Sequence, residues 1–130
     1  LLSMRKEDVH LDDGYMVGGL KTEAGKNRII PIHSTIHQLV KAQLSELGDY
    51  LFSTRSGKPI SRQNFLKEMK NIGHTPHDTR HTFITRCHQC GILETDIRRI
   101  VGHSQKGVTQ SVYTHPDAEY LSNEIEKLFY

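Results

Sequence analysis

The sequence has little cysteine, no long apolar run and almost no net charge, and each shortage excludes a class of protein. Only two cysteines occur among 130 residues, too few for the disulfide framework of a small secreted domain. No stretch of about 18 apolar residues is present, so we expect no membrane span. No segment has the features of a signal peptide. These shortages predict a protein of a reducing cytoplasm, with no membrane partner.

The two cysteines, Cys87 and Cys90, are three positions apart in a predicted helix. A zinc site would need a second pair of ligands at suitable spacing. His81 and His88 are near in sequence, but the two thiols also continue the apolar face that Phe83 begins. We therefore predict core cysteines and no metal site.

The formal net charge of +2 is small for a protein that binds nucleic acid. Its distribution along the chain is uneven, however. Residues 55–70 carry five basic side chains against one acidic one, whereas residues 117–130 carry four acidic side chains against one basic one. The basic middle of the chain can form a local phosphate-binding surface without a high overall charge.

One stretch, residues 77–113, combines side chains that suit phosphate chemistry. His77 and Arg80 are three positions apart, which places them on one face of a helix. The arginine fork matches two phosphate oxygens and stays charged at physiological pH. His103 would add a third hydrogen-bond donor. The arrangement predicts a site for one phosphodiester, with Arg80 stabilising the charge of a transition state.

The nucleophile for such a site is best sought at Tyr113. Ser104 and Ser111 are the serines of this stretch, and neither lies in a nucleophile-elbow or Ser-His-Asp pattern. A phenol with a pKa of about 10 is a weak nucleophile alone, so it needs neighbouring cations and a base. The nearby histidines and arginine supply both.

The motifs closely resemble the catalytic core of the tyrosine recombinases, the phage integrase family. They are H-x-x-R-H-T-F from His77, I-x-x-I-V-G-H-S from Ile97 and V-T-Q-x-V-Y-T-H from Val108. One departure is a segment between the Gly-His pair and the tyrosine that is one residue longer than in many members. The resemblance implies a role for each matched residue: Arg80 grips the scissile phosphate, His77 is the general acid/base, His103 hydrogen-bonds the phosphate, and Tyr113 forms a 3′-phosphotyrosyl link to DNA.

A second resemblance lies in the sequence KTEAGKNRIIPI over residues 21–32, which is similar to a hairpin of the same family. It implies that Lys21 reaches the DNA minor groove and protonates the leaving 5′-oxygen. The alternative is that Lys21 contacts only backbone or solvent. Lys26 and Arg28 are either phosphate contacts or solvated surface. Arg55 and Arg62, in the basic middle of the chain, are the candidates for further DNA contacts.

The predicted fold is mainly α (α+β), with a small three-stranded antiparallel sheet near the N-terminus. We expect strands over residues 8–11, 15–20 and 27–32, joined by tight turns. Helices are expected over residues 34–47, 61–71, 76–91, 95–101 and 117–129, with Ser34 and Ser61 as N-caps of the first two. The second helix should bury Phe65, Leu66 and Met69.

The ends of the chain carry two further expectations. The resemblance places a first catalytic arginine about four residues before Leu1. Residues 1–130 would then be a catalytic domain that lacks its start and any N-terminal core-binding domain, inactive alone. The last helix is amphipathic. It either packs on its own domain or docks onto a neighbouring protomer, and we favour docking within a homotetramer on DNA.

The predicted function is site-specific DNA recombination or integration by strand cleavage and rejoining, without ATP, metal or any other cofactor. The partner is double-stranded DNA, and the expected source is a bacterium, phage or mobile element. Two alternatives stay open. A type IB topoisomerase would use the same chemistry without exchanging strands between partners. A DNA-binding module would keep the fold but no longer cut.

Overall fold

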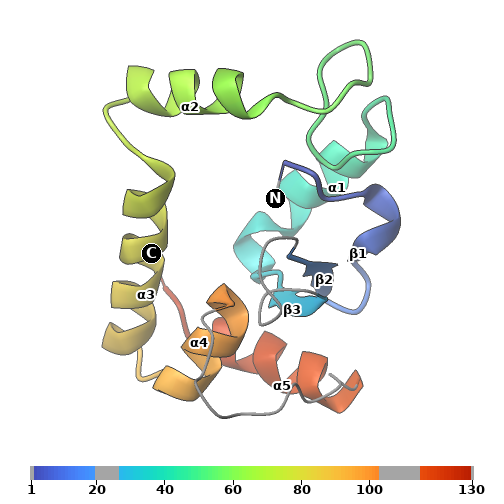
Figure 1. Cartoon of the computed structure of the whole chain (residues 1–130). Coiled ribbons are helices and arrows are strands. Elements are labelled where there is room, and N and C mark those ends of the chain that lie inside the picture. The colour runs from blue at the N-terminus through green and yellow to red at the C-terminus, as the bar shows by residue number, and fades with distance from the viewer. Residues whose placement is uncertain (1, 20–26, 103–114, 130) are drawn as a thin grey trace.

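The computed structural model describes residues 2–19, 27–102 and 115–129. For residues 115 and 116 it describes the backbone alone. Five α-helices and a small antiparallel sheet make up these ranges, which confirms the predicted α+β fold (Figure 1). None of the helices in the described ranges has the length and apolar character to cross a membrane. The elements in chain order are η1 (Lys6–Asp8), β1 (Val9–His10), β2 (Tyr15–Gly18), β3 (Arg28–Pro31), η3 (Ser34–Ile36), α1 (His37–Ser45), α2 (Arg62–Asn71), α3 (Pro76–Gln89), α4 (Glu94–Val101) and α5 (His115–Ile125).

The sheet has the order β1-β2-β3, and both strand pairs are antiparallel. Met16 lies opposite Ile30, and Val17 lies opposite Ile29. Because side chains alternate along a strand, Ile29 and Ile30 point to opposite faces. The predicted strands lie at the right places but are shorter, and Ile32 already belongs to the following loop.

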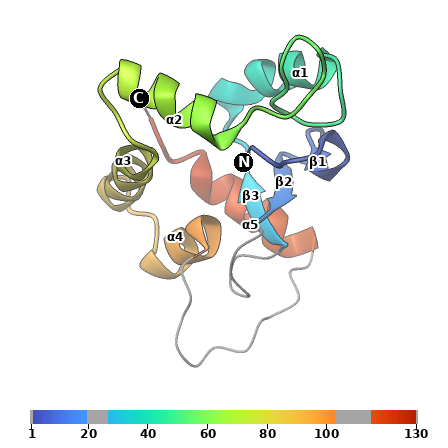
Figure 2. The ribbon, with the colours of Figure 1, turned by 45° about the horizontal axis from the view of Figure 1, so that its top comes forward.

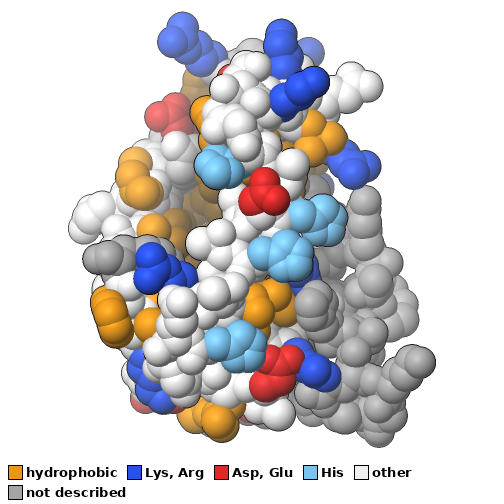
Figure 3. All heavy atoms as spheres, turned by 90° about the vertical axis from the view of Figure 1, so that its left-hand side faces the viewer, with side chains coloured by type: hydrophobic (Ala, Val, Ile, Leu, Met, Phe, Trp, Pro, Cys, Tyr) orange, Lys and Arg blue, Asp and Glu red, His pale blue; other side chains and the backbone are white. Residues whose placement is uncertain are grey.

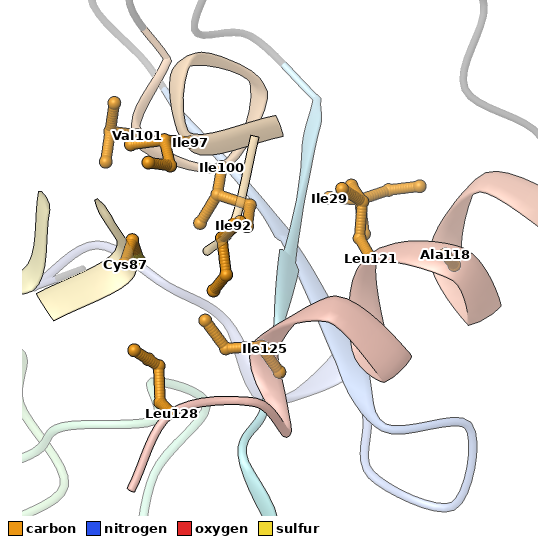
Figure 4. Packing of buried hydrophobic residues seen from close by; sticks show 10 residues of the cluster. All are labelled: Ile29, Cys87, Ile92, Ile97, Ile100, Val101, Ala118, Leu121, Ile125 and Leu128. Carbon is orange, nitrogen blue, oxygen red and sulfur yellow. The ribbon is translucent and has the colours of Figure 1, made fainter. Parts of the chain in front are cut away.

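Two apolar clusters lie on the two faces of the sheet. One face packs on α3, α4 and α5, where Figure 4 shows the cluster around Ile29. The other face packs on the N-terminal segment and α1, around Met4, Met16 and Val40. Figures 1 and 2 show α1 on one side of the sheet and α5 on the other. β3 contributes to both clusters, so the two halves of the molecule share this strand.

The start of the first long helix differs from the prediction. α1 begins only at His37, after the turn η3, and Ile36 at its N-cap position makes no side-chain cap hydrogen bond. His33 caps η3, because its Nδ1 accepts a hydrogen bond from the backbone N–H of Thr35 at 3.1 Å. Ser34, the predicted N-cap, instead donates its backbone N–H and its hydroxyl to the carboxylate of Glu126, at 2.6 and 2.7 Å. Glu126 is 92 positions from Ser34 in the sequence, so the local sequence pattern could not predict these hydrogen bonds.

α2 begins as predicted, because Ser61 accepts a hydrogen bond from the Asn64 N–H at 3.1 Å. The predicted burial of its apolar side chains is wrong. No residue of α2 is buried: Leu66 is exposed, and Phe65 and Met69 are half-buried. In Figure 1 the helix lies at the opposite end of the molecule from α4 and α5, and no residue of α2 belongs to either apolar cluster.

α5 packs on its own domain, which was the alternative to docking on a neighbour. Leu121 is fully buried and Ile125 nearly so, and Leu128 beyond the helix is also buried. The carbonyl of Leu128 lies 2.8 Å from Nε2 of the buried His33. Because Nδ1 of His33 accepts from Thr35, its Nε2 carries the proton and donates to that carbonyl. Phe129, expected on the apolar face, is exposed.

Candidate phosphate-binding site

The helix that carries His77 and Arg80 has a well-defined start. Thr75 is its N-cap and Pro76 occupies the first turn. The Thr75 side chain accepts from the Asp78 N–H at 3.3 Å, while the Asp78 carboxylate accepts from the Thr75 N–H at 2.7 Å. This reciprocal capping box holds the first turn. The hydrogen bonds from Thr75 lower the pKa of Asp78 below its ordinary value, as expected for a carboxylate that caps a helix.

Arg80 lies one turn after His77 and points toward the end of α4. Its Nη2 donates to the carbonyl oxygen of Val101 at 2.7 Å. Val101 is the last residue of α4, where unpaired carbonyls and the helix dipole favour a cation. This contact fixes one edge of the guanidinium and holds it, half-buried, beside Gly102.

Gly102 ends α4 in the left-handed conformation, at φ 72°, which glycine adopts without steric cost. The predicted helix end is therefore confirmed. A methyl group at Gly102 would lie 2.8 Å from Nη1 of Arg28. Arg28 from β3 and Arg80 from α3 thus approach the same helix end from two directions. His103 is the next residue in the sequence and lies outside the described residues.

A cavity of about 420 Å³ separates β3 and α3 beside this helix end. Arg28 and Arg80 both line it, and the rest of its wall is largely apolar. The other lining residues are Ile30, Pro31, His33, Thr35, Ile36, Thr79, Phe83, Ile100, Val101, Ile125 and Leu128. Two guanidinium groups that line one hollow can bind an anion together.

The structure brings together only some of the predicted site residues. Arg80 and Arg28 converge on the end of α4, and His77 is exposed one turn from Arg80. Arg55 and Arg62 are exposed in the loop before α2 and at its start, at the other end of the molecule. The remaining candidates, Lys21, Lys26, His103 and Tyr113, lie outside the described residues.

A stripe of exposed histidines lies along the outer face of α3. His74, just before the helix, is exposed, as are His77, His81 and His88, and Figure 3 shows histidine side chains along this face. Their spacing of three, four and seven residues could have revealed the stripe from sequence. In the described ranges no group of three or more histidine, cysteine or acidic side chains could hold a metal ion.

The cysteines follow the prediction in part. Cys87 is fully buried in the cluster with Ile29, and Cys90 is half-buried at the end of α3. Both thiols are free. Burial raises the pKa of Cys87 to about 11, and the nearby Cys90 adds to the shift. A buried thiol with a raised pKa is inert as a nucleophile.

Two neighbouring arginines of α4, Arg98 and Arg99, point in different directions. Arg98 points outward and pairs with Glu94 of its own helix, at 2.6 Å. Arg99 turns toward α5 and pairs with Asp117, at 2.9 Å. The sequence offered no signal for this contact, because the two residues are 18 positions apart and α5 was free to lie elsewhere.

Comparison with known proteins adds the family. The model of the phage integrase family matches residues 1–120. Tyrosine recombinase XerA of Thermococcus kodakarensis is 31% identical over 98% of the chain, and XerD of Chlorobaculum tepidum is 30% identical over all of it. XerD of Halalkalibacterium halodurans is 29% identical over 88%.

The chain spans less than half the length of these relatives, between 43% and 49%. No solved structure was found to match it. The family model, however, covers nearly the whole chain, including the helix with His77 and Arg80, the end of α4 and the segment with Tyr113. On this evidence the chain belongs to the phage integrase family.

Proposed function

We propose that this chain is the DNA-cutting domain of a site-specific tyrosine recombinase. The observation that carries the proposal is the position of Arg80, which the carbonyl of Val101 holds beside Gly102. The next residue along the chain is His103, and Tyr113 follows ten positions later. One short piece of chain therefore leads from the anchored guanidinium to the predicted donor and nucleophile.

In the proposed reaction the phenol oxygen of Tyr113 attacks the scissile phosphorus and loses its proton to His77. The bond from phosphorus to the 5′-oxygen breaks, and Lys21 supplies the proton to that oxygen. Arg80 and His103 stabilise the negative charge that gathers on the non-bridging oxygens. The phosphate stays esterified to the protein, so a new 5′-hydroxyl can reverse the step without ATP.

Arg28, predicted as either a phosphate contact or solvated surface, lies beside the proposed site. Its contact with Gly102 puts a second guanidinium at the rim of the same hollow. We assign it a DNA-phosphate contact beside the one held by Arg80. Arg55 and Arg62 would contact the duplex further away.

The partner in this proposal is double-stranded DNA carrying a recombination site, bound by a homotetramer. The place of action is the bacterial cytoplasm, where a chromosomal, phage or mobile-element target lies. Recombination differs from topoisomerase action in its products, because strands from two duplexes become joined. Intermolecular joined products in a reaction with two labelled duplexes support recombination, and relaxation of supercoils alone supports a topoisomerase.

The test is covalent trapping by the intact protein on a nicked duplex that carries its target site, selected from a random library. We expect a protein–DNA adduct that disappears in Tyr113→Phe and persists in Tyr50→Phe. Tyr50 is a fair control because its half-buried ring packs under Arg5, away from α4. An adduct that survives Tyr113→Phe would overturn the proposed nucleophile.

A further inference from the structure

A polar cluster joins α4 to α5. Nη2 of Arg99 donates to Oδ1 of Asp117 at 2.9 Å, and Nη1 lies 3.6 Å from Oδ1 of Asp96. The hydroxyl of Tyr120 donates to Oδ2 of Asp96 at 2.9 Å. Two residues of each helix therefore take part, and we call these four the α4–α5 clamp.

The clamp is a well-defined contact, because one of its members is a buried charge. Asp96 is 4% exposed, and a buried carboxylate requires charge and hydrogen bonds to offset its lost hydration. Arg99 supplies the charge and Tyr120 the hydrogen bond. Arg99 also keeps only about a quarter of its side chain exposed, at 28%. Water therefore screens these contacts less than it screens the outward pair of Arg98 and Glu94.

The clamp lies between two parts of the proposed active site. Arg80 is tied to Val101, two residues after Arg99. Asp117 lies four residues after Tyr113, and α5 itself begins only two residues after it. A continuous series of contacts thus runs from the guanidinium of Arg80 through α4 and Arg99 to Asp117 in the first turn of α5.

We infer that Arg99 and Asp117 are positioning residues, which set the place of the chain that carries the nucleophile relative to Arg80. This inference rests on the proposed function. Chemistry between oriented groups depends steeply on their separation, and a misplacement of about 1 Å can lower a rate about 100-fold. The clamp holds the first turn of α5, and in the sequence only Thr114 separates the start of α5 from Tyr113.

The raised pKa of Tyr120 is consistent with this picture. The hydrogen bond to Asp96 is the largest cause of the raised pKa, and desolvation of the phenol adds to it. The phenol therefore stays protonated and keeps donating to Asp96 at neutral pH. Its hydroxyl is a hydrogen-bonded member of the clamp.

The test is a double-mutant cycle in the intact protein, with Arg99→Ala, Asp117→Ala and the double variant. The rate constant of adduct formation at saturating DNA and the Kd for DNA are measured separately. We expect each single variant to cut about 10-fold more slowly, with Kd changed less than about 2-fold, since the two groups pair with each other. The double variant should be no slower than the worse single one, because paired residues couple. Arg99→Lys should recover most of the rate.

Arg98→Ala is the matched control, since Arg98 is the neighbouring cation of the same helix and pairs within it. It should cut at the wild-type rate. Tyr120→Phe removes one hydroxyl without emptying the core, so it keeps the test valid if an alanine variant unfolds. It should also slow cutting at unchanged Kd.

The possible failures are distinct. Variants that cut like the wild type, or that lose rate only in proportion to DNA binding or folded fraction, overturn the positioning role. Additive losses in the cycle overturn the pairing. A wild-type protein that forms no adduct at Tyr113 overturns the proposed function, and this inference with it.

Discussion

The proposed phosphate-binding role of Arg80 could be predicted from its residue type and its spacing from His77. Its hydrogen-bond partner in the fold could not. The spacing of three residues placed His77 and Arg80 on one face of a helix. The phosphate role followed from the paired N–H donors of the guanidinium. Its bond to the Val101 carbonyl depends on α4 ending beside α3. A contact between residues 21 positions apart, set by the packing of two helices, leaves no local pattern in the sequence.

Replacing Arg80 tests its role directly. Arg80→Ala in the intact protein should lower the rate of adduct formation by about 100-fold or more, because a group aimed at transition-state charge is lost. Arg80→Lys should remain impaired, since a point charge cannot pair two phosphate oxygens in a plane. Arg86→Ala, an exposed arginine of the same helix, is the control and should leave the rate unchanged. Equal rates for Arg80→Ala and wild type would contradict the assignment.

The two cysteines should differ in reactivity. Cys87 is fully buried and its pKa is raised to about 11, whereas Cys90 is half-buried at the helix end. Alkylation of the native protein at pH 8 should therefore label Cys90 first and leave Cys87 unlabelled until the protein unfolds, because only the thiolate reacts. Peptide mass spectrometry identifies the labelled site. Early labelling of Cys87 would mean that the core around α3 is open.

At the scale of elements, helix starts were predictable where the signal is local. Ser61 and Pro76 act within their own first turns, so the start of α2 and the first turn of α3 lie where the sequence placed them. Ser34 failed as a cap because it already lies inside the turn η3, which His33 caps, and its donors bind Glu126, 92 positions away. The burial of Phe65, Leu66 and Met69 failed for a related reason. An apolar stripe shows which face of a helix can be buried, but not whether another element lies there.

The capping box of α3 should give the stability of the protein a pH dependence at acid pH. The pKa of Asp78 is lower in the folded protein than in the unfolded chain. Its carboxylate therefore stabilises the fold above its unfolded pKa, and the stabilisation is lost as the pH falls through the folded pKa. Asp78→Asn should thus be less stable than wild type at pH 7, and the difference should shrink below about pH 4. Urea unfolding at pH 7 and pH 3 measures it. A difference that does not change with pH would contradict the capping role.

The packing of α5 on its own domain makes a prediction about stability. Leu121 is fully buried, so Leu121→Ala should lower the free energy of unfolding by about 3 kcal/mol through lost burial and a cavity. Phe129, 75% exposed, is the matched control, and Phe129→Ala should change it by less than about 0.5 kcal/mol. Urea denaturation of the isolated chain at low concentration checks both. If Leu121→Ala is neutral in the monomer, α5 does not pack in cis in solution.

At the scale of the whole molecule, the sheet is the element that both halves share. Ile29 and Ile30 of β3 belong to opposite clusters, and Arg28 at the start of the same strand reaches the end of α4. The alternation of the strand and the overall α+β class followed from the sequence. The sequence could not predict that Arg28 and Arg80 converge, because this depends on how β3 and α3 pack around the end of α4.

The C-terminal segment links the molecule to its proposed assembly. Its apolar side chains are already buried in cis, and Glu126 and Leu128 are held by Ser34 and His33. Exchange of this segment between protomers would have to break these contacts in one domain and re-form them in another. The homotetramer therefore stays a prediction, and the surface that would join its protomers need not be the apolar face of α5.

The measurement that tests the account most directly is the chemical identity of the link between the intact protein and cleaved DNA. The adduct trapped on the nicked target duplex is digested with protease and nuclease, and the remaining peptide–nucleotide is sequenced by mass spectrometry. We predict a phosphodiester between the phenol oxygen of Tyr113 and the 3′-phosphate of the DNA, with a free 5′-hydroxyl on the released strand. A link at any other residue, or a 5′-phosphate on the protein, would contradict it.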